Sequence, residues 1–177
     1  MKERSPGETY EKPYVAIPIL ESPLFKWVQS INGNKKFYHI TLLFLGTIDD
    51  ETLPEIKESI ASIPKAVNHL SIIPEKLDFI GASKDAFVLK IMQTDELLSI
   101  RDALEEKLPK NQINERQFIP HITIKASKRG NFSKHERETL LDINDVSQKL
   151  GSYTADKIGL YYRTEEGATA LLFLKKI

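Results

Sequence analysis

One tripeptide, His-Ile-Thr, occurs twice in this chain, each time inside an apolar segment that is typical of a buried β-strand. The first copy spans residues 39–41 in "FYHITLLFLG", and the second spans residues 121–123 in "FIPHITIKAS". Successive side chains of a strand point to opposite faces, so the His and the Thr of each copy face the same side. The sequence therefore predicts two strands that each present an imidazole beside a hydroxyl.

The expected secondary structure follows a similar order in the two halves of the chain. Apolar periodicity and capping signals predict strand, helix and motif strand at 14–20, 22–31 and 37–45, and again at 86–92, 94–108 and 118–126. Further helices are expected at 49–63 and 133–143, and further strands at 66–73, 76–80, 153–163 and 169–176. Element order thus indicates a weak internal duplication. We predict an α+β fold of two pseudo-twofold related lobes, with mainly antiparallel sheets, outer helices and the motif strands facing each other across a central cleft.

Length and composition predict one domain over residues 1–177 and exclude several kinds of partner and site. Lys plus Arg and Asp plus Glu number 25 each, so no broad positive field is available to hold long nucleic acid. With no cysteine, disulfides and thiolate nucleophiles are excluded, which fits a cytoplasmic protein. The polar N-terminus and the lack of an apolar run near 20 residues predict no signal peptide and no membrane partner. We expect a monomer.

The paired motifs suit chemistry at a phosphate. Imidazole titrates near neutral pH, so one His can accept a proton while the other donates one. Thr41 and Thr123 could donate hydrogen bonds to the charged oxygens of a phosphorane-like transition state. Lys125 lies two positions after Thr123, hence on the same expected strand face, and could add positive charge. Such a scheme needs no metal and no cofactor.

Other site classes have little support in the sequence. The chain contains no His-Glu-x-x-His, no Gly-rich phosphate loop and no Gly-x-Ser-x-Gly. A single His on an apolar strand is more often a hydrogen-bonded core residue than a catalyst, but here two such residues share one triplet. His69 and His135 lack the triplet, and we assign them no role.

Together, "HITLLFLGTIDDE" and "FIPHITI", with "YVAIPIL" as an opening strand, resemble the two-histidine (2H) phosphoesterase superfamily. The resemblance covers nearly the whole chain and is strongest to the RNA 2′,3′-cyclic phosphodiesterases, also called 2′-5′ RNA ligase-like proteins. It implies a bilobal fold and metal-free opening of a 2′,3′-cyclic phosphate, at an RNA end or on a small nucleotide, to a 2′-phosphate. It also implies that His39 is the general acid, His121 the general base, and Thr41 and Thr123 ligands of the phosphate oxygens.

The chain departs from the family pattern at two places. Members usually carry an Arg shortly after the second motif, where this chain has Ala126; Lys125, Lys128 and Arg129 are candidates to replace it. Lysine lacks the bidentate fork of arginine, so the departure bears on the substrate more than on the reaction. The usual Tyr of the closing strand is also missing from "GATALLFL", and Tyr161 and Arg163 in "YYR" are candidates to hold a nucleotide.

Two alternatives stay open at this point. The first keeps the superfamily and changes the substrate to 2′-5′-linked oligoadenylate, a cyclic oligonucleotide signal or ADP-ribose cyclic phosphate. The second is a binding module that retains the cleft without catalysis. Turnover of a cyclic phosphate, and its rate relative to the other substrates, would separate these hypotheses.

Overall fold

The computed structural model describes residues 9–32, 37–63, 70–109, 113–114, 117–127, 131–141, 150–164 and 168–177. The elements are, in chain order, β1 (Tyr14–Ile19), α1 (Pro23–Asn32), β2 (Tyr38–Leu45), α2 (Leu53–Ala61), β3 (Leu70–Ile72), β4 (Pro74–Ile80), β5 (Ala86–Ile91), α3 (Asp95–Lys107), β6 (Ile113–Asn114), β7 (His121–Ala126), α4 (Lys134–Leu141), β8 (Tyr153–Ala155), β9 (Lys157–Arg163) and β10 (Thr169–Lys176). The predicted alternation of strands and helices is therefore present in both halves.

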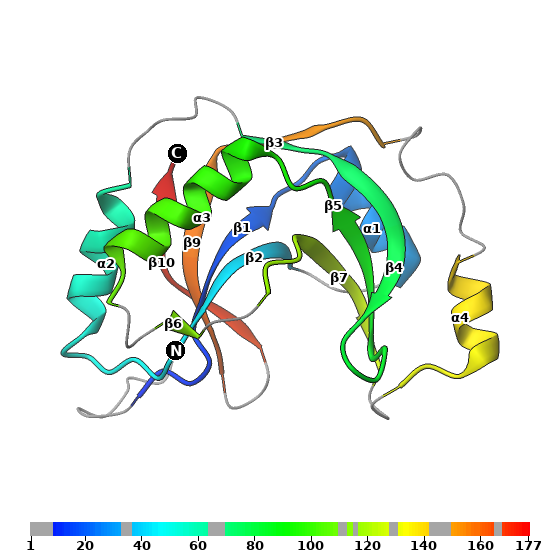
Figure 1. Ribbon diagram of the computed structural model, residues 1–177, viewed down its shortest axis with the longest axis horizontal. Helices are drawn as coiled ribbons and strands as arrows, with labels where there is room; N and C mark the ends of the chain where they lie inside the picture. The colour runs from blue at the N-terminus through cyan, green and yellow to red at the C-terminus, as the bar shows by residue number, and fades with distance from the viewer. Residues whose placement is uncertain are drawn as a thin grey trace.

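One large sheet runs through both halves of the molecule. Its strand order is β10-β9-β1-β2-β7-β5-β4, with β6 beside β2, and β3 and β8 form a separate two-stranded sheet. All strand pairs of the described residues are antiparallel. Figure 1 shows the large sheet as an arch, with β10, β9, β1 and β2 on one side and β7, β5 and β4 on the other. The expected mainly antiparallel α+β fold is confirmed.

The two motif strands are direct neighbours in this sheet. They pair at Ile40↔Ile122 and then diverge toward opposite sides of the arch (Figure 1). We expected the two strands to face each other across a cleft, each in the sheet of its own lobe. Instead a short pairing at the top of the arch joins the two lobes, and the strands separate below it.

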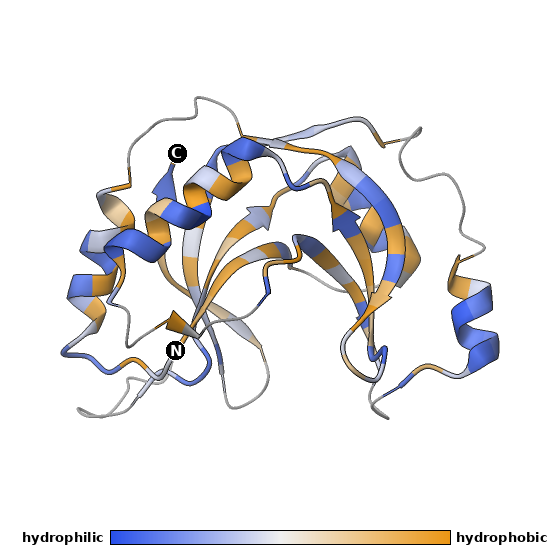
Figure 2. Ribbon diagram, viewed as in Figure 1, coloured by the Kyte–Doolittle hydropathy of each residue, from blue (hydrophilic) through white to orange (hydrophobic). Residues whose placement is uncertain are grey.

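The central isoleucines lie on the core face of the sheet. Ile40 pairs with Ile17 on β1, and Ile122 pairs with Leu89 on β5, so a row of apolar residues crosses four strands. All four are fully buried in the main hydrophobic core. Because strand side chains alternate, this burial turns the flanking His and Thr residues to the opposite face, as predicted. Figure 2 shows that hydrophobic residues dominate the strands around this point.

Helix starts follow the expected capping chemistry. The backbone N–H of Phe25 donates to Oγ of Ser22 at 3.0 Å, and the N–H of Leu97 donates to Oγ1 of Thr94 at 3.3 Å. Each hydroxyl satisfies an N–H that the first helical turn leaves unpaired. The predicted apolar stripe of α3 is buried: Leu97, Ile100, Leu104 and Leu108.

Helix α4 begins with a reciprocal cap, and its partly buried Leu140 packs against the main core. The N–H of Ser133 donates to the Glu136 carboxylate at 2.8 Å, and the N–H of Glu136 donates to Oγ of Ser133 at 3.2 Å, which confirms the predicted capping box. No side chain of α4 is buried, and Figure 2 shows the helix as largely hydrophilic. Among the described residues, no helix combines the length and apolar character needed to cross a bilayer.

The predicted closing strand 153–163 is divided into two. Strand β8 pairs with β3 in the small sheet, whereas β9 pairs with β1 and β10 in the large one. The change of sheet occurs at Asp156, whose carbonyl accepts a hydrogen bond from the N–H of Ile177 at 2.9 Å. One predicted strand thus supplies strands to two sheets. The bond from Ile177 continues the β9–β10 ladder, in which Lys176 pairs with Lys157, by one residue to Asp156.

Candidate active site

The antiparallel pairing places the two triplets side by side on one sheet face. Next to the Ile40↔Ile122 pair, antiparallel geometry brings His39 beside Thr123 and Thr41 beside His121. All four side chains are half-buried. The topology therefore gathers, from positions far apart in the chain, the two imidazoles and two hydroxyls that the sequence singled out.

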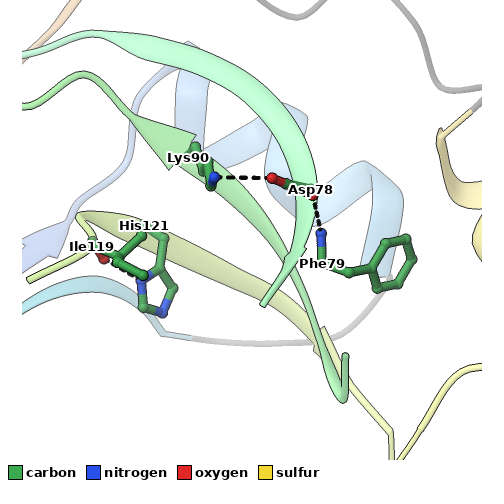
Figure 3. A network of polar contacts seen from close by, with 5 residues as sticks. All are labelled: Asp78, Phe79, Lys90, Ile119 and His121. Atoms are coloured by element: carbon green, nitrogen blue, oxygen red, sulfur yellow. Dashed lines mark hydrogen bonds and ion pairs between the residues drawn. The ribbon is translucent and has the colours of Figure 1, made fainter. Parts of the chain in front are cut away.

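The orientation of His121 is set by the chain just before it. Nδ1 of His121 lies 2.6 Å from the carbonyl oxygen of Ile119 (Figure 3). A carbonyl only accepts, so Nδ1 carries the hydrogen, and in the neutral ring the lone pair is on Nε2. Burial lowers the pKa of His121 below its ordinary value of 6.5, although the bond to Ile119 opposes part of this effect. His121 is thus held as a neutral imidazole with a basic Nε2 at neutral pH.

The surroundings of His39 are aromatic. Its ring is stacked with Tyr14, at 4.9 Å between centroids and 29° between planes, and with Phe37, at 5.2 Å and 23°. Tyr161 contacts the same group, at 5.0 Å from Phe37 and 5.8 Å from Tyr14. Rings packed in this way restrict the rotation of the imidazole and hold it in place.

Tyr161, a residue predicted to hold the substrate, lies in this aromatic group. It pairs with Tyr14 across β9 and β1, and it also lines a second, mostly apolar cavity of about 310 Å³ with Phe37. Burial, followed by its proximity to Tyr14, raises the pKa of Tyr161 to about 12. Its neighbour Tyr162 takes the other face and packs edge-on against Tyr10 at 5.1 Å.

Arg163, also predicted to hold the substrate, is exposed near the end of β9. Burial raises the pKa of Tyr14, while a hydrogen bond with Thr169 and the positive charge of Arg163 act to lower it. Arg163 therefore places its charge near Tyr14, at the edge of the aromatic group. It is not among the residues that line the cavity at His121.

Lys125 does not share the face of Thr123, contrary to our expectation. Thr123 pairs with Val88, but Lys125 pairs with Phe87, so Ile124 is an extra residue in β7 and forms a β-bulge. The bulge rotates Lys125 to the side of Phe87, which is part of the main core. Its Nζ lies 5.9 Å from the centre of the Phe132 ring. Side chains alternate only along a regular strand, and the bulge interrupts that alternation between Thr123 and Lys125.

A cavity of about 380 Å³ adjoins the two triplets. Thr41 and His121 line it together with the chain before β7, the β4–β5 turn and Arg101 of α3. We did not identify Arg101 from the sequence, because its spacing to Glu105 is that of an ordinary ion pair on a helix surface. Lys128 and Arg129, the other candidates for the missing family arginine, lie outside the described residues.

Lys90 is a further cation close to the second triplet. It pairs with His121 across β5 and β7, and its Nζ forms a 2.9 Å ion pair with Asp78 of β4 (Figure 3). Burial acts to raise the pKa of Asp78, but the hydrogen bonds from Lys90 and the N–H of Phe79, with the nearby lysine charges, lower it overall. Asp78 thus remains a carboxylate and stays ion-paired with Lys90. Among the described residues, no three His, Asp or Glu side chains are grouped as metal ligands.

Comparison with known protein families agrees with this geometry. A family model described as the 2′-5′ RNA ligase superfamily matches residues 31–167, most of the chain and both triplets. The chain belongs to the 2′-5′ RNA ligase superfamily. The expected 2H phosphoesterase class is thereby confirmed, and the chain is an enzyme of this class. This assignment disfavours the non-catalytic binding module.

Relatives within this superfamily carry a consistent name. The RNA 2′,3′-cyclic phosphodiesterase of Methanocaldococcus jannaschii is 30% identical over 135 residues, which are 73% of each chain. The Bacillus subtilis protein of the same name is 28% identical over 103 residues, 56% of this chain and 54% of its own. Among solved structures, E. coli LigT complexed with NADP+ has a TM-score of 0.69 at 17% identity, covering 96% of this chain and 99% of LigT. LigT complexed with 3′-AMP has a TM-score of 0.68 at 15% identity, with the same coverage. These structures support the fold.

Proposed function

We propose that the chain hydrolyses a 2′,3′-cyclic phosphodiester, at an RNA end or on a small nucleotide, to a 2′-phosphate. The reaction uses His39 and His121 as acid and base and requires no metal. The names of the sequence relatives support the substrate class. The observation that carries the proposal is the pairing at Ile40↔Ile122, which brings the two His-Ile-Thr triplets together on one face.

His121 is the better placed of the two histidines to act as the base. Its Nδ1–H is engaged by the Ile119 carbonyl, so Nε2 carries the lone pair that accepts a proton from water. A pKa lowered by burial keeps the ring neutral at the working pH. The resulting hydroxide attacks phosphorus, and the proton remains on His121.

His39 then acts as the acid. As the bond between phosphorus and the 3′ oxygen breaks, His39 donates a proton to that oxygen, leaving a 3′-hydroxyl and a 2′-phosphate. The stacked rings of Tyr14 and Phe37 hold the imidazole in position for this transfer. Proton exchange with solvent returns His39 to the charged form and His121 to the neutral form.

Thr41 and Thr123 bind the non-bridging oxygens of the phosphate. Each threonine lies beside the histidine of the other triplet, so a phosphate between the imidazoles meets a hydroxyl from each strand. Hydroxyl donors are most useful where negative charge grows in the transition state. Thr41 also lines the 380 Å³ cavity, which offers space for the rest of a nucleotide.

The test uses an oligonucleotide that ends in a 2′,3′-cyclic phosphate, incubated with the protein in excess EDTA. We expect multiple turnovers to a 2′-phosphate, and a loss of roughly 10²- to 10⁴-fold in His39→Ala and in His121→Ala. His135→Ala is the control, because His135 is exposed on α4. Unchanged turnover in both motif variants would disprove the proposed chemistry.

A further inference from the structure

The proposed site needs a cation that the motif strands do not supply. A cyclic phosphate is an anion, and its transition state gathers further negative charge on the non-bridging oxygens. Lys125 is turned toward Phe87 and Phe132 by the bulge in β7. Lys90 is paired with Asp78 and does not line the cavity at His121.

Arg101 enters the same cavity from a different element. It lies in the middle of α3, and it lines the cavity together with Thr41 and His121. Its guanidinium carbon lies 5.0 Å from the centre of the Phe118 ring, whose face holds the planar group from one side. Phe118 belongs to the segment that leads into β7, so Arg101 is positioned against the chain that presents His121.

The hydrogen bonding of this guanidinium leaves capacity for a ligand. Nη2 is paired with the Glu105 carboxylate one turn along the helix. Nε is buried, and no described residue accepts a hydrogen bond from it. Only 19% of the side chain is exposed, so solvent reaches little of it. A buried N–H without an acceptor is unfavourable unless a ligand provides one.

We infer that Arg101 binds a phosphate oxygen of the substrate in this cavity and supplies the positive charge that is missing from the motif strands. The inference rests on the proposed function and names the cation of that site. An arginine suits the position because its rigid fork bonds phosphate oxygens and it is less strongly hydrated than a lysine. The alternative is a structural arginine that holds only Phe118 and Glu105.

The experiment measures binding of 3′-AMP and of adenosine to the whole chain in EDTA by calorimetry. Arg101→Gln should weaken the binding of 3′-AMP about tenfold to a hundredfold, the range for a charge-assisted hydrogen bond, and should leave the binding of adenosine unchanged. The affinity of Arg101→Lys for 3′-AMP should fall between those of the unmodified protein and Arg101→Gln. Lys107→Gln is the matched control: it removes the same charge from the same helix, at an exposed position.

A second measurement on the unmodified protein covers the case in which Arg101→Gln fails to fold. The Nε–H resonance of Arg101, assigned by its loss in Arg101→Lys, should shift on addition of 3′-AMP and stay in place with adenosine. If Arg101 is only structural, Arg101→Gln should lower the thermal stability, leave the affinity for 3′-AMP unchanged, and the Nε–H resonance should not shift with 3′-AMP. An unchanged affinity or an unshifted resonance would each overturn the inference. The inference would also be overturned if Lys90→Gln weakened the binding of 3′-AMP and Arg101→Gln did not.

The outcomes separate this inference from the proposed function. If the histidine variants retain turnover while Arg101→Gln weakens the binding of 3′-AMP, the assignment of Arg101 to the phosphate stands and the proposed chemistry fails. If the histidine variants lose turnover while Arg101→Gln binds normally, the chemistry stands and the assignment of Arg101 fails.

Discussion

The two halves of the site carry the same triplet in different surroundings. His39 is packed against the rings of Tyr14 and Phe37, whereas His121 is bonded to a backbone carbonyl and borders an open cavity. The triplet supplies an imidazole and a hydroxyl in both halves, and the neighbours distinguish them. Identical motifs can therefore take unequal parts in one reaction.

The difference begins two residues before each histidine. In the first half that position is Phe37, whose ring stacks on His39. In the second half it is Ile119, whose carbonyl fixes Nδ1 of His121, and the intervening Pro120 has no N–H. A side chain orients one imidazole, and the main chain orients the other.

The largest effect that we predict beyond the histidine variants is for the threonines. Thr41→Val and Thr123→Val should each lower kcat by roughly 10²-fold, because each removes one donor to the charged phosphate while preserving shape. Thr→Ser at either position keeps the hydroxyl and should retain most activity. Loss in only one of the two valine variants, measured by steady-state kinetics, would show that the halves share the phosphate unequally.

The pH dependence should identify the half that holds the base. A base works deprotonated, so kcat/KM rises with pH through the pKa of His121. Because burial lowers that pKa, the plateau should be reached below the pH that an exposed His, with a pKa near 6.5, would require. A kcat/KM profile, with the His121 resonance followed by NMR, tests this. An acid limb at or above 6.5 would contradict it.

A smaller change should separate the two modes of orientation. Phe37→Leu removes the ring beside His39, and we expect a several-fold decrease in kcat with little change in KM, because the acid loses part of its positioning. Ile119→Leu is the matched variant in the other half. It keeps the carbonyl that bonds His121, so kcat should stay near that of the unmodified protein. Equal kcat values for the two variants would count against the distinction.

The smallest effect should be that of Lys125→Gln. Since the bulge turns this lysine away from Thr123, kcat and KM should be unchanged. Loss of its contact with Phe132 should reduce the free energy of unfolding by about 0.5 kcal/mol, the scale of an exposed cation–π pair. Steady-state kinetics and a denaturant titration measure the two effects. A tenfold rise in KM for Lys125→Gln would show that Lys125 contacts the substrate.

Features that depend on local pattern could be predicted from the sequence. The strand alternation around both triplets and the caps at Ser22, Thr94 and Ser133 follow from neighbouring residues alone. The bulge at Ile124 could not be predicted, because it is defined by register with β5. Nor could the place of Arg101, because its spacing to Glu105 is common on helices and its access to the cavity comes from the packing of α3.

The most direct test of the account is the leaving-group dependence of the two histidine variants. A 2′,3′-cyclic phosphorothiolate with sulfur at the 3′ position has a leaving group that departs without protonation. With this substrate, His39→Ala should recover most of the lost rate, whereas His121→Ala should remain slow, because water still needs a base. Equal recovery in both variants, or recovery in His121→Ala alone, would contradict the division of roles between the two halves.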